Sequence, residues 1–380
     1  MCEGHIIYTI FYGGGIYMKR FLAVVLMVAL LLTGCGAPAQ NSAGAPSTEV
    51  KKGDTFADKK YKIAYILNGT STDIFKMAFN GAIKEGTYDG IKVDVFTSDG
   101  DDLKFQDLVN QCSQQGYNGL YLSHGKPQYS YDLIKPLVEK GIKVVAFDTV
   151  IADANGKGID GVTQIFQNDQ KMAQMTLDYI CNVLFPDKKP IRVLKLWRGP
   201  GIPPFDRRQE IYKKFEDEGK IKTLEVLGPS NPADSEGSIA SVVASVLPKY
   251  PKGTVDVVWS AYDAYGRGAY KALIEAGRKD VPIVSIDISN QDLNFMRESD
   301  SIWNASVAVH FENVGIMGIR LLAKKLHGDE TPKEYILSPS LVTAKQITPN
   351  ANVENLGTVV KDYGVCNDHL ENWMLELRKK

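Results

Sequence analysis

Three aspartates follow apolar runs that are typical of β-strands. Asp148 and Asp287 come directly after such runs, and Asp263 comes shortly after a third. In doubly wound sheets, ligands bind in the crevice beyond the carboxyl ends of the strands. A carboxylate there can accept hydrogen bonds from several ligand donors at once. These residues are therefore candidates for ligand binding, and the alternative for each is a helix N-cap.

Motifs that would carry catalysis or hold a cofactor are absent from the sequence. It contains no GxGxxG after a strand, no GxxxxGK[ST], no GxSxG, no HExxH and no CxxC. The five histidines have no partner at metal-ligand spacing. We therefore expect no cofactor, no metal and no catalytic residue, although a hydrolase that uses two carboxylates remains an alternative. A net charge of −1 argues against nucleic acid as a partner.

The candidate residues need an alternating set of strands and helices to position them. Ile63–Leu67 is nearly all apolar, as in a strand buried on both faces, and Phe75, Phe79 and Ala82 then share one helix face. Further candidate strands are Val93–Phe96, Leu120–Leu122, Val144–Phe147, Val193–Trp197, Leu224–Leu227, Val255–Trp259 and Ile283–Ile286. Helical segments separate most of them, which predicts parallel sheets. The length of 380 residues favours two domains, so the predicted fold class is α/β with two doubly wound parallel-sheet lobes.

The first 60 residues have the pattern of a targeting segment and a linker. After Met18 come two basic residues, an apolar run at 21–32, and the sequence LTGC that ends at Cys35. LTGC resembles the bacterial lipobox, whose cysteine is lipidated, and a 12-residue run is too short to span a bilayer as a helix. We expect a leader at 1–34, a lipid on Cys35 and a flexible tether at 35–60, which would anchor the protein on the extracytoplasmic side of a membrane. A start at Met1 or Met18 and an ordinary signal peptide both remain open.

Five stretches of the body resemble a known family. They are KIAYILNGTSTDIFKMAFNGAIKEG at 62–86, GIKVVAFDT at 141–149, VVWSAYDAYGRGAYKALIEAG at 257–277, PIVSIDIS at 282–289 and NVGIMGIRLLAKKLHGDE at 313–330. In this order they are similar to the type I periplasmic binding proteins, in the ribose- and galactose-binding branch. The resemblance covers nearly all of residues 61–340.

The resemblance implies two lobes, a ligand cleft between them, and a hinge of three crossovers at 166–169, 309–311 and 337–340. It implies an N-terminal lobe of residues 61–167 with 310–337 and a C-terminal lobe of residues 168–309 with 338–380. Hinge closure would present a surface to the permease of an ABC importer in the membrane. A monomer is expected.

The resemblance also implies roles for individual residues. Phe75 matches an aromatic that lies against the sugar ring, and Asp148 matches an aspartate that accepts hydrogen bonds from two ligand hydroxyls. Arg208 matches an arginine that donates to ligand oxygens, and Asp287 matches the last aspartate of the family pattern. The alternatives are core packing for Phe75 and a surface ion pair for Arg208; Arg207 is expected at the surface.

Other positions depart from the ribose-binding pattern. Thr149 stands where that pattern has an arginine, Asp234 where it has an aromatic, and Tyr262 where it has an asparagine, with Asp263 beside it. These departures put ribose itself in doubt. The remaining candidates around the cleft are Asp73, His124 and Asn168.

The implied pocket has an unbalanced charge. One clear cation, Arg208, would face four aspartates, namely Asp148, Asp234, Asp263 and Asp287. Carboxylates that lie close together repel one another. Either some of them point away, or the ligand is rich in donors, such as an amino sugar or a polyol.

The leading interpretation is a solute-binding lipoprotein that captures a monosaccharide-like ligand for an ABC importer. A receptor for a sugar or an autoinducer-2-like signal is the first alternative, and a surface carbohydrate hydrolase is the second. Residues 367–379 are expected to form a helix that docks on one lobe without a ligand role. Cys112, Cys181 and Cys366 are interpreted as structural or incidental.

Overall fold

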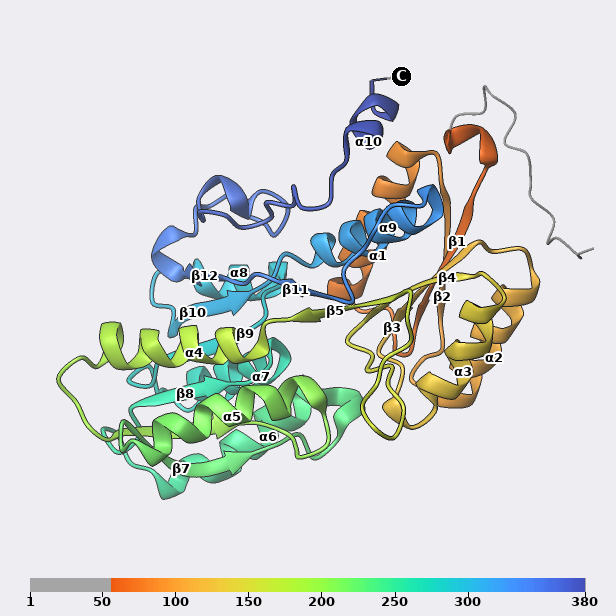
Figure 1. The fold of residues 1–380 in the computed structure, drawn as a ribbon. Helices are drawn as coiled ribbons and strands as arrows, with labels where there is room; N and C mark the ends of the chain where they lie inside the picture. Colours follow the sequence, from red (N-terminus) through yellow and green to blue (C-terminus); the bar gives the residue numbers. More distant parts are fainter. Residues whose placement is uncertain (1–55, 380) are drawn as a thin grey trace, which may run out of the picture. The chain divides into compact units, whose positions relative to one another are not determined.

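The computed structural model describes residues 56–379, which contain two six-stranded sheets covered by helices (Figure 1). The strands of the first sheet are β1 Lys62–Leu67, β2 Lys92–Thr97, β3 Gly119–Ser123, β4 Lys143–Phe147, β5 Val162–Gln167 and β11 Glu334–Leu337. Those of the second are β6 Ile191–Leu196, β7 Ile221–Leu227, β8 Val257–Ser260, β9 Ile283–Ile286, β10 Trp303–Ala308 and β12 Ser340–Thr343. The helices are α1 Asp73–Asp89, α2 Asp102–Gln114, α3 Pro127–Glu139, α4 Asp169–Tyr179, α5 Pro203–Asp217, α6 Ser235–Val246, α7 Asp263–Glu275, α8 Asn290–Met296, α9 Phe311–His327 and α10 Asn372–Leu377.

Both sheets have the strand order of doubly wound folds. The first runs β11-β5-β4-β3-β1-β2 with all pairs parallel. The second runs β12-β10-β9-β8-β6-β7 and is parallel except for the edge strand β12, which is antiparallel to β10. In parallel strands both faces are covered, so apolar residues are needed on both sides.

The strand β1 shows how the sequence specifies this burial. Ile63, Tyr65 and Leu67 point into an apolar cluster with α1 and α9, whereas Ala64 and Ile66 point into a second cluster with α2 and α3. Helices therefore lie on both faces of the first sheet. The continuous apolar run in the sequence is confirmed as a strand buried on both sides.

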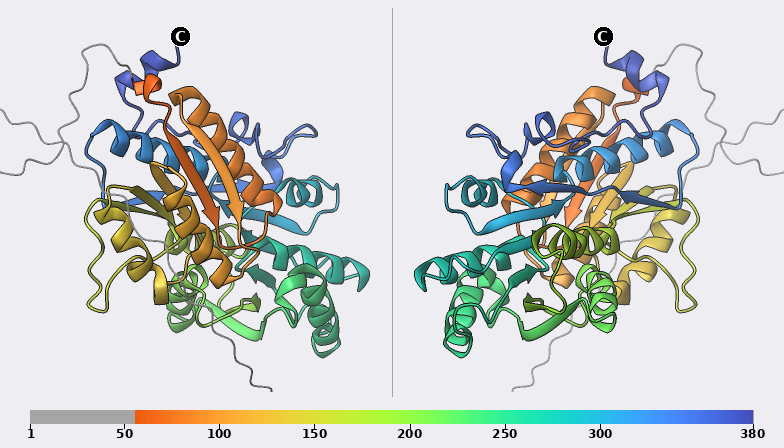
Figure 2. Two further views of the ribbon diagram at one scale, coloured as in Figure 1. Left: turned by 90° about the vertical axis from the view of Figure 1, so that its right-hand side faces the viewer. Right: turned by 90° about the vertical axis from the view of Figure 1, so that its left-hand side faces the viewer.

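The chain passes between the two sheets three times. It crosses between β5 and α4, between β10 and α9, and between β11 and β12. The predicted fold class, two doubly wound lobes with a three-crossover hinge, is confirmed. We call the part around the first sheet, with α1–α3 and α9, the first lobe, and the part around the second sheet, with α4–α8, the second lobe (Figure 2).

The C-terminal segment differs from the prediction. Leu356 and Val360 belong to the apolar cluster of the second lobe, but Met374 is buried in the cluster of the first lobe. The assignment of all of 338–380 to one lobe is therefore corrected, because the segment contacts both. The predicted helix at 367–379 is shortened to α10, which packs beside α1.

Candidate functional site

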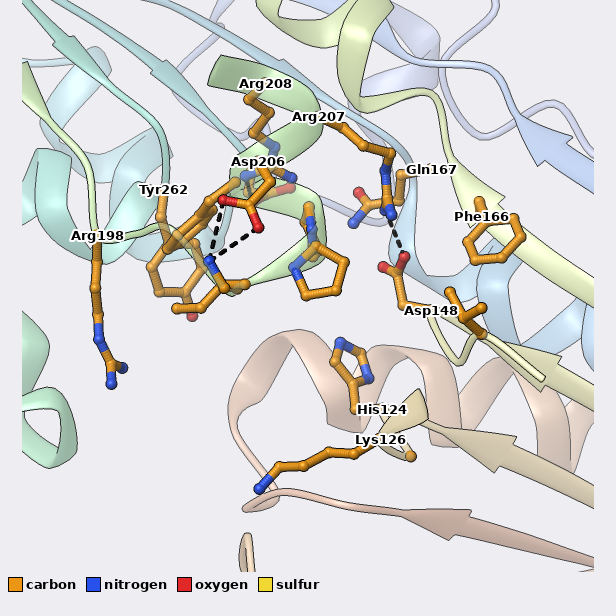
Figure 3. Close-up of a pocket in the computed structure, with 18 of the residues that line it drawn as sticks. His124, Lys126, Asp148, Phe166, Gln167, Arg198, Asp206, Arg207, Arg208 and Tyr262 are labelled. Atoms are coloured by element: carbon orange, nitrogen blue, oxygen red, sulfur yellow. Dashed lines mark hydrogen bonds and ion pairs between the residues drawn. The ribbon is translucent and has the colours of Figure 1, made fainter. Parts of the chain in front are cut away.

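A cavity of about 600 Å³ lies between the two lobes, where the carboxyl ends of their strands meet (Figure 3). This volume falls in the range of small-molecule sites, roughly 300–1,000 Å³. Six predicted residues line it: Phe75, His124, Asp148, Arg208, Tyr262 and Asp287. Both lobes contribute to the wall, so a ligand in the cavity would contact both.

Three of these residues occupy strand ends with unusual backbone geometry. His124, Asp148 and Asp287 follow β3, β4 and β9 directly, and their φ angles are 62°, 42° and 70°. Each backbone N–H still donates to the neighbouring strand; for Asp148 the acceptor is the carbonyl of Ile165, at 3.0 Å. Left-handed backbone is costly for non-glycine residues and concentrates at functional sites. Here it turns the chain immediately after the last ladder hydrogen bond and sets the side chain at the cavity wall.

Charged side chains of alternating sign form a continuous chain across the site. Arg207 donates to Asp148 Oδ1 at 2.8 Å and to Asp169 Oδ2 at 2.6 Å. Arg208 donates to Asp169 Oδ1 at 2.7 Å and lies 3.4 Å from Asp287 Oδ2. Arg207 and Arg208 are adjacent near the start of α5, while the three carboxylates come from two strand ends and from the first residue of α4. Asp169 thus connects the two arginines at the first crossover.

Arg207 corrects the sequence prediction. It was expected at the surface, but only 26% of its side chain is exposed, and it joins Asp148 of the first lobe to α5 of the second. The expected excess of acids over a single cation is corrected with it, because two arginines now face Asp148, Asp169 and Asp287. The adjacency of Arg207 to Arg208 was the available signal, but only the direction of α5 shows that both reach the site.

Two of these carboxylates retain an unused acceptor. Asp148 Oδ2, Asp287 Oδ1 and Gln167 Oε1 are buried, and none of them has a hydrogen-bond partner among residues 56–379. Burial raises the pKa of Asp287 to about 7, against the opposing effect of Arg208, and burial also raises the pKa of Asp148. Buried polar atoms without a partner are rare. All three residues line the cavity, so a ligand with hydrogen-bond donors can satisfy them.

The first-lobe wall of the cavity is aromatic. Phe75 packs edge-on against His124 and Phe311, with ring centroids 5.1 and 5.8 Å apart. Burial lowers the pKa of His124 to about 4, so its ring is neutral at physiological pH. From the second lobe, Tyr262 lines the cavity and packs edge-on against Tyr265 at 5.5 Å. Such rings suit the apolar C–H face of a sugar.

Five predicted residues do not line the cavity. Asp73 is an exposed partner of Lys76; Asn168 and Asp234 accept backbone N–H groups as the caps of α4 and α6. Thr149 is buried, where its hydroxyl accepts from Gly125 N and donates to the carbonyl of Phe147.

Asp263 is the fifth, and its position shows why it was wrongly grouped with the other strand-end acids. It is the first residue of α7 and is 1% exposed, with its carboxylate paired to Arg267 at 2.8 Å. Arg267 is one helical turn further on and also binds Asp292 at 2.9 Å. The prediction also missed some lining residues: Phe166, Gln167, Arg198, Tyr265 and Phe311.

A comparison with known families now identifies the fold. A model described as a periplasmic binding protein domain matches residues 63–330. The chain belongs to the periplasmic binding protein family. The match covers most of both lobes, and the predicted recognition of a type I, ribose/galactose-like member is confirmed.

Three relatives of this periplasmic binding protein illustrate the similarity. A structure titled sugar ABC transporter, from Yersinia enterocolitica, is 38% identical, with a TM-score of 0.76 over 84% of this chain and 95% of the other. The ribose import binding protein of Salmonella typhimurium is 24% identical over 284 residues, 74% of this chain and 90% of the relative. A 5-methylthioribose transporter solute-binding protein from Thermotoga lettingae shares the fold at 22% identity, with a TM-score of 0.75 over 84% of this chain and 98% of the other.

Within residues 56–379, no helix has the length and apolar character needed to cross a bilayer. Cys112, Cys181 and Cys366 are free thiols. The predicted leader at 1–34, the lipid site Cys35 and most of the tether lie outside the described residues.

Proposed function

We propose that this protein captures a sugar or a closely related polyhydroxylated molecule between its lobes and delivers it to an ABC importer. One observation carries the proposal: Asp148 and Asp287, from opposite lobes, line one cavity, and each keeps a buried oxygen that has no hydrogen-bond partner in the described part of the chain. Hydroxyl groups of a single ligand would satisfy both. The relatives named for sugar import support the same conclusion.

Binding would favour the closed arrangement of the lobes. A ligand hydroxyl shared by Asp148 and the Arg207 guanidinium needs α5 of the second lobe close to β4 of the first, as in the present structure. Only a ligand that binds the closed state better than the open state can shift this equilibrium. The rings of Phe75 and Tyr262 would exclude water from the less polar face of the ligand.

The proposal includes lipid attachment at Cys35, which would hold the protein on the extracytoplasmic side of the membrane. The LTGC sequence after an apolar run supports it. Metabolic labelling with a radioactive fatty acid tests this step. Incorporation should require Cys35, and equal labelling of Cys35→Ser would contradict it.

A ligand panel with matched variants tests the binding function. D-ribose, D-galactose, 5-methylthioribose, ribitol and glucosamine would each be titrated by calorimetry and by thermal unfolding. At a hundredfold excess over Kd, a ligand stabilises the folded state by about 2.7 kcal/mol. We expect at least one sugar or polyol to do so with the wild type and with Asp234→Asn, whose carboxylate lies away from the cavity, and Asp148→Asn to bind it at least tenfold more weakly.

The panel also separates the alternatives. Release of monosaccharide from oligosaccharides or from nitrophenyl glycosides would favour a hydrolase. The absence of any thermal shift across the panel would contradict sugar capture. Binding without turnover supports a receptor, and uptake assays in cells that lack the chain then distinguish import from signalling.

A further inference from the structure

The C-terminal segment contacts both lobes and runs past the hinge between them. It begins after β12 of the second lobe and ends at α10 beside α1 of the first lobe (Figure 1). The segment does not line the cavity and is not part of the three crossovers. Its contacts with each lobe show which of its residues are fixed in place.

On the second lobe the segment is fixed by apolar burial and by hydrogen bonds. Leu356 and Val360 are 0% and 2% exposed within the core cluster of that lobe. Val353 N donates to Asn290 Oδ1 at 2.9 Å, at the start of α8. Arg297, just after α8, donates to the carbonyl of Ala351.

On the first lobe, a buried arginine of α9 binds the segment directly. Arg320, 2% exposed, donates to the carbonyls of Cys366 and Asp368 at 2.9 and 2.8 Å and to Glu85 of α1 at 2.7 Å. Further along, Trp373 stacks on His327 with ring centroids 4.3 Å apart.

The end of the segment adds one apolar and two polar anchors on the same lobe. Met374 is fully buried, and Trp373 Nε1 donates to Asp329 at 2.9 Å. Arg378 pairs with Glu85 of α1. The segment therefore cannot leave this lobe without exposing core surface and removing two hydrogen-bond acceptors of the buried Arg320.

Between the two anchored parts, the segment lies against the second crossover. His310 stands between β10 and α9, and the ring of Tyr363 packs edge-on against it at 5.0 Å. His310 also bonds the carbonyl of Val353 through Nε2 at 3.1 Å. Gly364 has a φ of +79°, and a Cβ there would lie 3.4 Å from the His310 ring. The segment therefore packs directly on the second crossover, one of the three connections at which hinge bending is expected.

We propose that residues 351–378 form a strap, a fourth connection between the lobes, which restrains opening of the cleft in the ligand-free protein. Hinge bending changes backbone angles at a few residues between rigid bodies. The strap is anchored to both bodies and packed on the hinge, so opening has to deform it as well. A restrained hinge keeps a larger fraction of molecules in the binding-competent arrangement, which raises apparent affinity in proportion.

Lengthening the strap tests the proposal without removing its anchors. Two variants of the full chain would carry two or six Gly/Ser residues inserted after Gly364; six extended residues add about 20 Å of slack. The control carries the six residues after Gly116, an exposed glycine between α2 and β3 where an added Cβ would meet no atom within 4 Å. Circular dichroism and thermal unfolding would verify that each variant is folded.

The readout is small-angle X-ray scattering of the ligand-free proteins, so it does not depend on which ligand the site binds. We expect the six-residue insertion to increase the radius of gyration by roughly 5% from a value of about 21 Å for a compact chain of this length. The two-residue insertion should give a smaller increase, and the control none. Amide hydrogen exchange around His310 should also become faster in the two strap variants.

Identical scattering curves and exchange rates for the wild type and both strap variants would overturn the proposal. An equal increase in the control would overturn it too, because the change would then not arise from the strap. Failure of the ligand panel would leave this result unaffected, so the strap and the sugar-binding function can fail separately.

Discussion

At the scale of single residues, the site depends on five charges whose signs alternate. Asp169 and Arg208 are 1% and 2% exposed, so each needs the other to remain charged away from water. Asp148, Arg207 and Asp287 lie at the cavity, where they can exchange part of this pairing for contacts with a ligand. We therefore expect the buried centre of the chain to be structural, and its two ends, Asp148 and Asp287, to contact the ligand.

Removal of Arg208 should destabilise the protein strongly. Arg208→Met keeps much of the side-chain volume but leaves Asp169 and Asp287 without this cation, and breaking such a buried pair costs about 3–5 kcal/mol. The free energy of unfolding by urea measures the effect. Arg198→Gln, at an exposed cavity residue, is the control and should stay within about 0.5 kcal/mol of the wild type. Equal stability of the Arg208 and Arg198 variants would contradict the structural role.

The raised pKa of Asp287 predicts a pH dependence of stability. Its pKa is about 7 in the folded protein and about 3.9 in an unfolded chain, so the folded state binds this proton more tightly. The free energy of unfolding therefore falls as pH rises from about 4 to about 7. Asp287→Asn does not titrate, so we expect it to gain stability relative to the wild type across this window, by roughly 3 kcal/mol at most.

Urea unfolding at pH 4, 5, 6, 7 and 8 measures this difference. Asp234→Asn, at an exposed helix cap where Asn replaces Asp well, is the control. A difference between Asp287→Asn and the wild type that is independent of pH would show that Asp287 does not titrate in this range.

At the scale of elements, close packing of α1 on α9 holds the first lobe behind the site. The two helices approach so closely that a Cβ on Gly315 would lie 1.8 Å from the carbonyl oxygen of Ala78. The same helices carry Phe75 and Phe311, which meet at the cavity wall. Helix separation would therefore disturb the aromatic face of the site as well as the core.

Gly315→Ala should force these helices apart. Overpacking of this kind costs about 1–3 kcal/mol, and sometimes more. The control is Gly69→Ala, because its added Cβ would meet only Leu67 at an ordinary 3.6 Å. Thermal unfolding should show a clearly lower Tm for Gly315→Ala alone, and similar values for the two variants would contradict the close approach.

At the scale of the whole molecule, three kinds of connection join the two lobes within residues 56–379. They are the crossovers, the proposed strap, and the ion pair of Asp148 with Arg207. This pair joins β4 of the first lobe to α5 of the second across the cleft. It is partly accessible from the cavity, so a ligand can reorganise it. We therefore expect Asp148 and Arg207 to act both in closure of the cleft and in ligand binding.

Loss of this ion pair should open the ligand-free protein. Arg207→Gln removes the cation opposite Asp148, and the distance between spin labels at Leu103→Cys in the first lobe and Val226→Cys in the second should lengthen or broaden. Both label sites are exposed. Burial raises the pKa of Cys112 and Cys366 to about 11, so these native thiols react slowly at pH 7.

Lys213→Gln provides the matched control for this measurement. It removes one cation from the same helix, but Lys213 pairs with Asp217 on the exposed side of α5. Its distance distribution should match the wild type. A distribution for Arg207→Gln that also matches the wild type would show that the ion pair does not hold the cleft closed.

The sequence by itself determined the fold class, and six of the eleven residues that it predicts for the site line the cavity. Long apolar runs such as Ile63–Leu67 have few alternatives to a buried parallel strand, and aspartates placed directly after such runs, at 148 and 287, do reach the cavity. The sequence analysis did not predict strands β5, β10, β11 and β12. Polar residues interrupt some of them, such as β5 with the sequence VTQIFQ, and others are short edge strands.

Only the tertiary structure decided which charges meet. Asp263 and Asp287 look alike in sequence, but Arg267 lies one turn after Asp263 and binds it, whereas Asp287 faces the cavity. Arg207 looks like a surface residue until the direction of α5 places it between the lobes. Periodicity, strand ends and the pairing of Asp263 with Arg267 are local properties of the chain. The partners of Asp148, Asp169 and Asp287 instead lie on segments far apart in sequence, and a local sequence pattern does not encode such contacts.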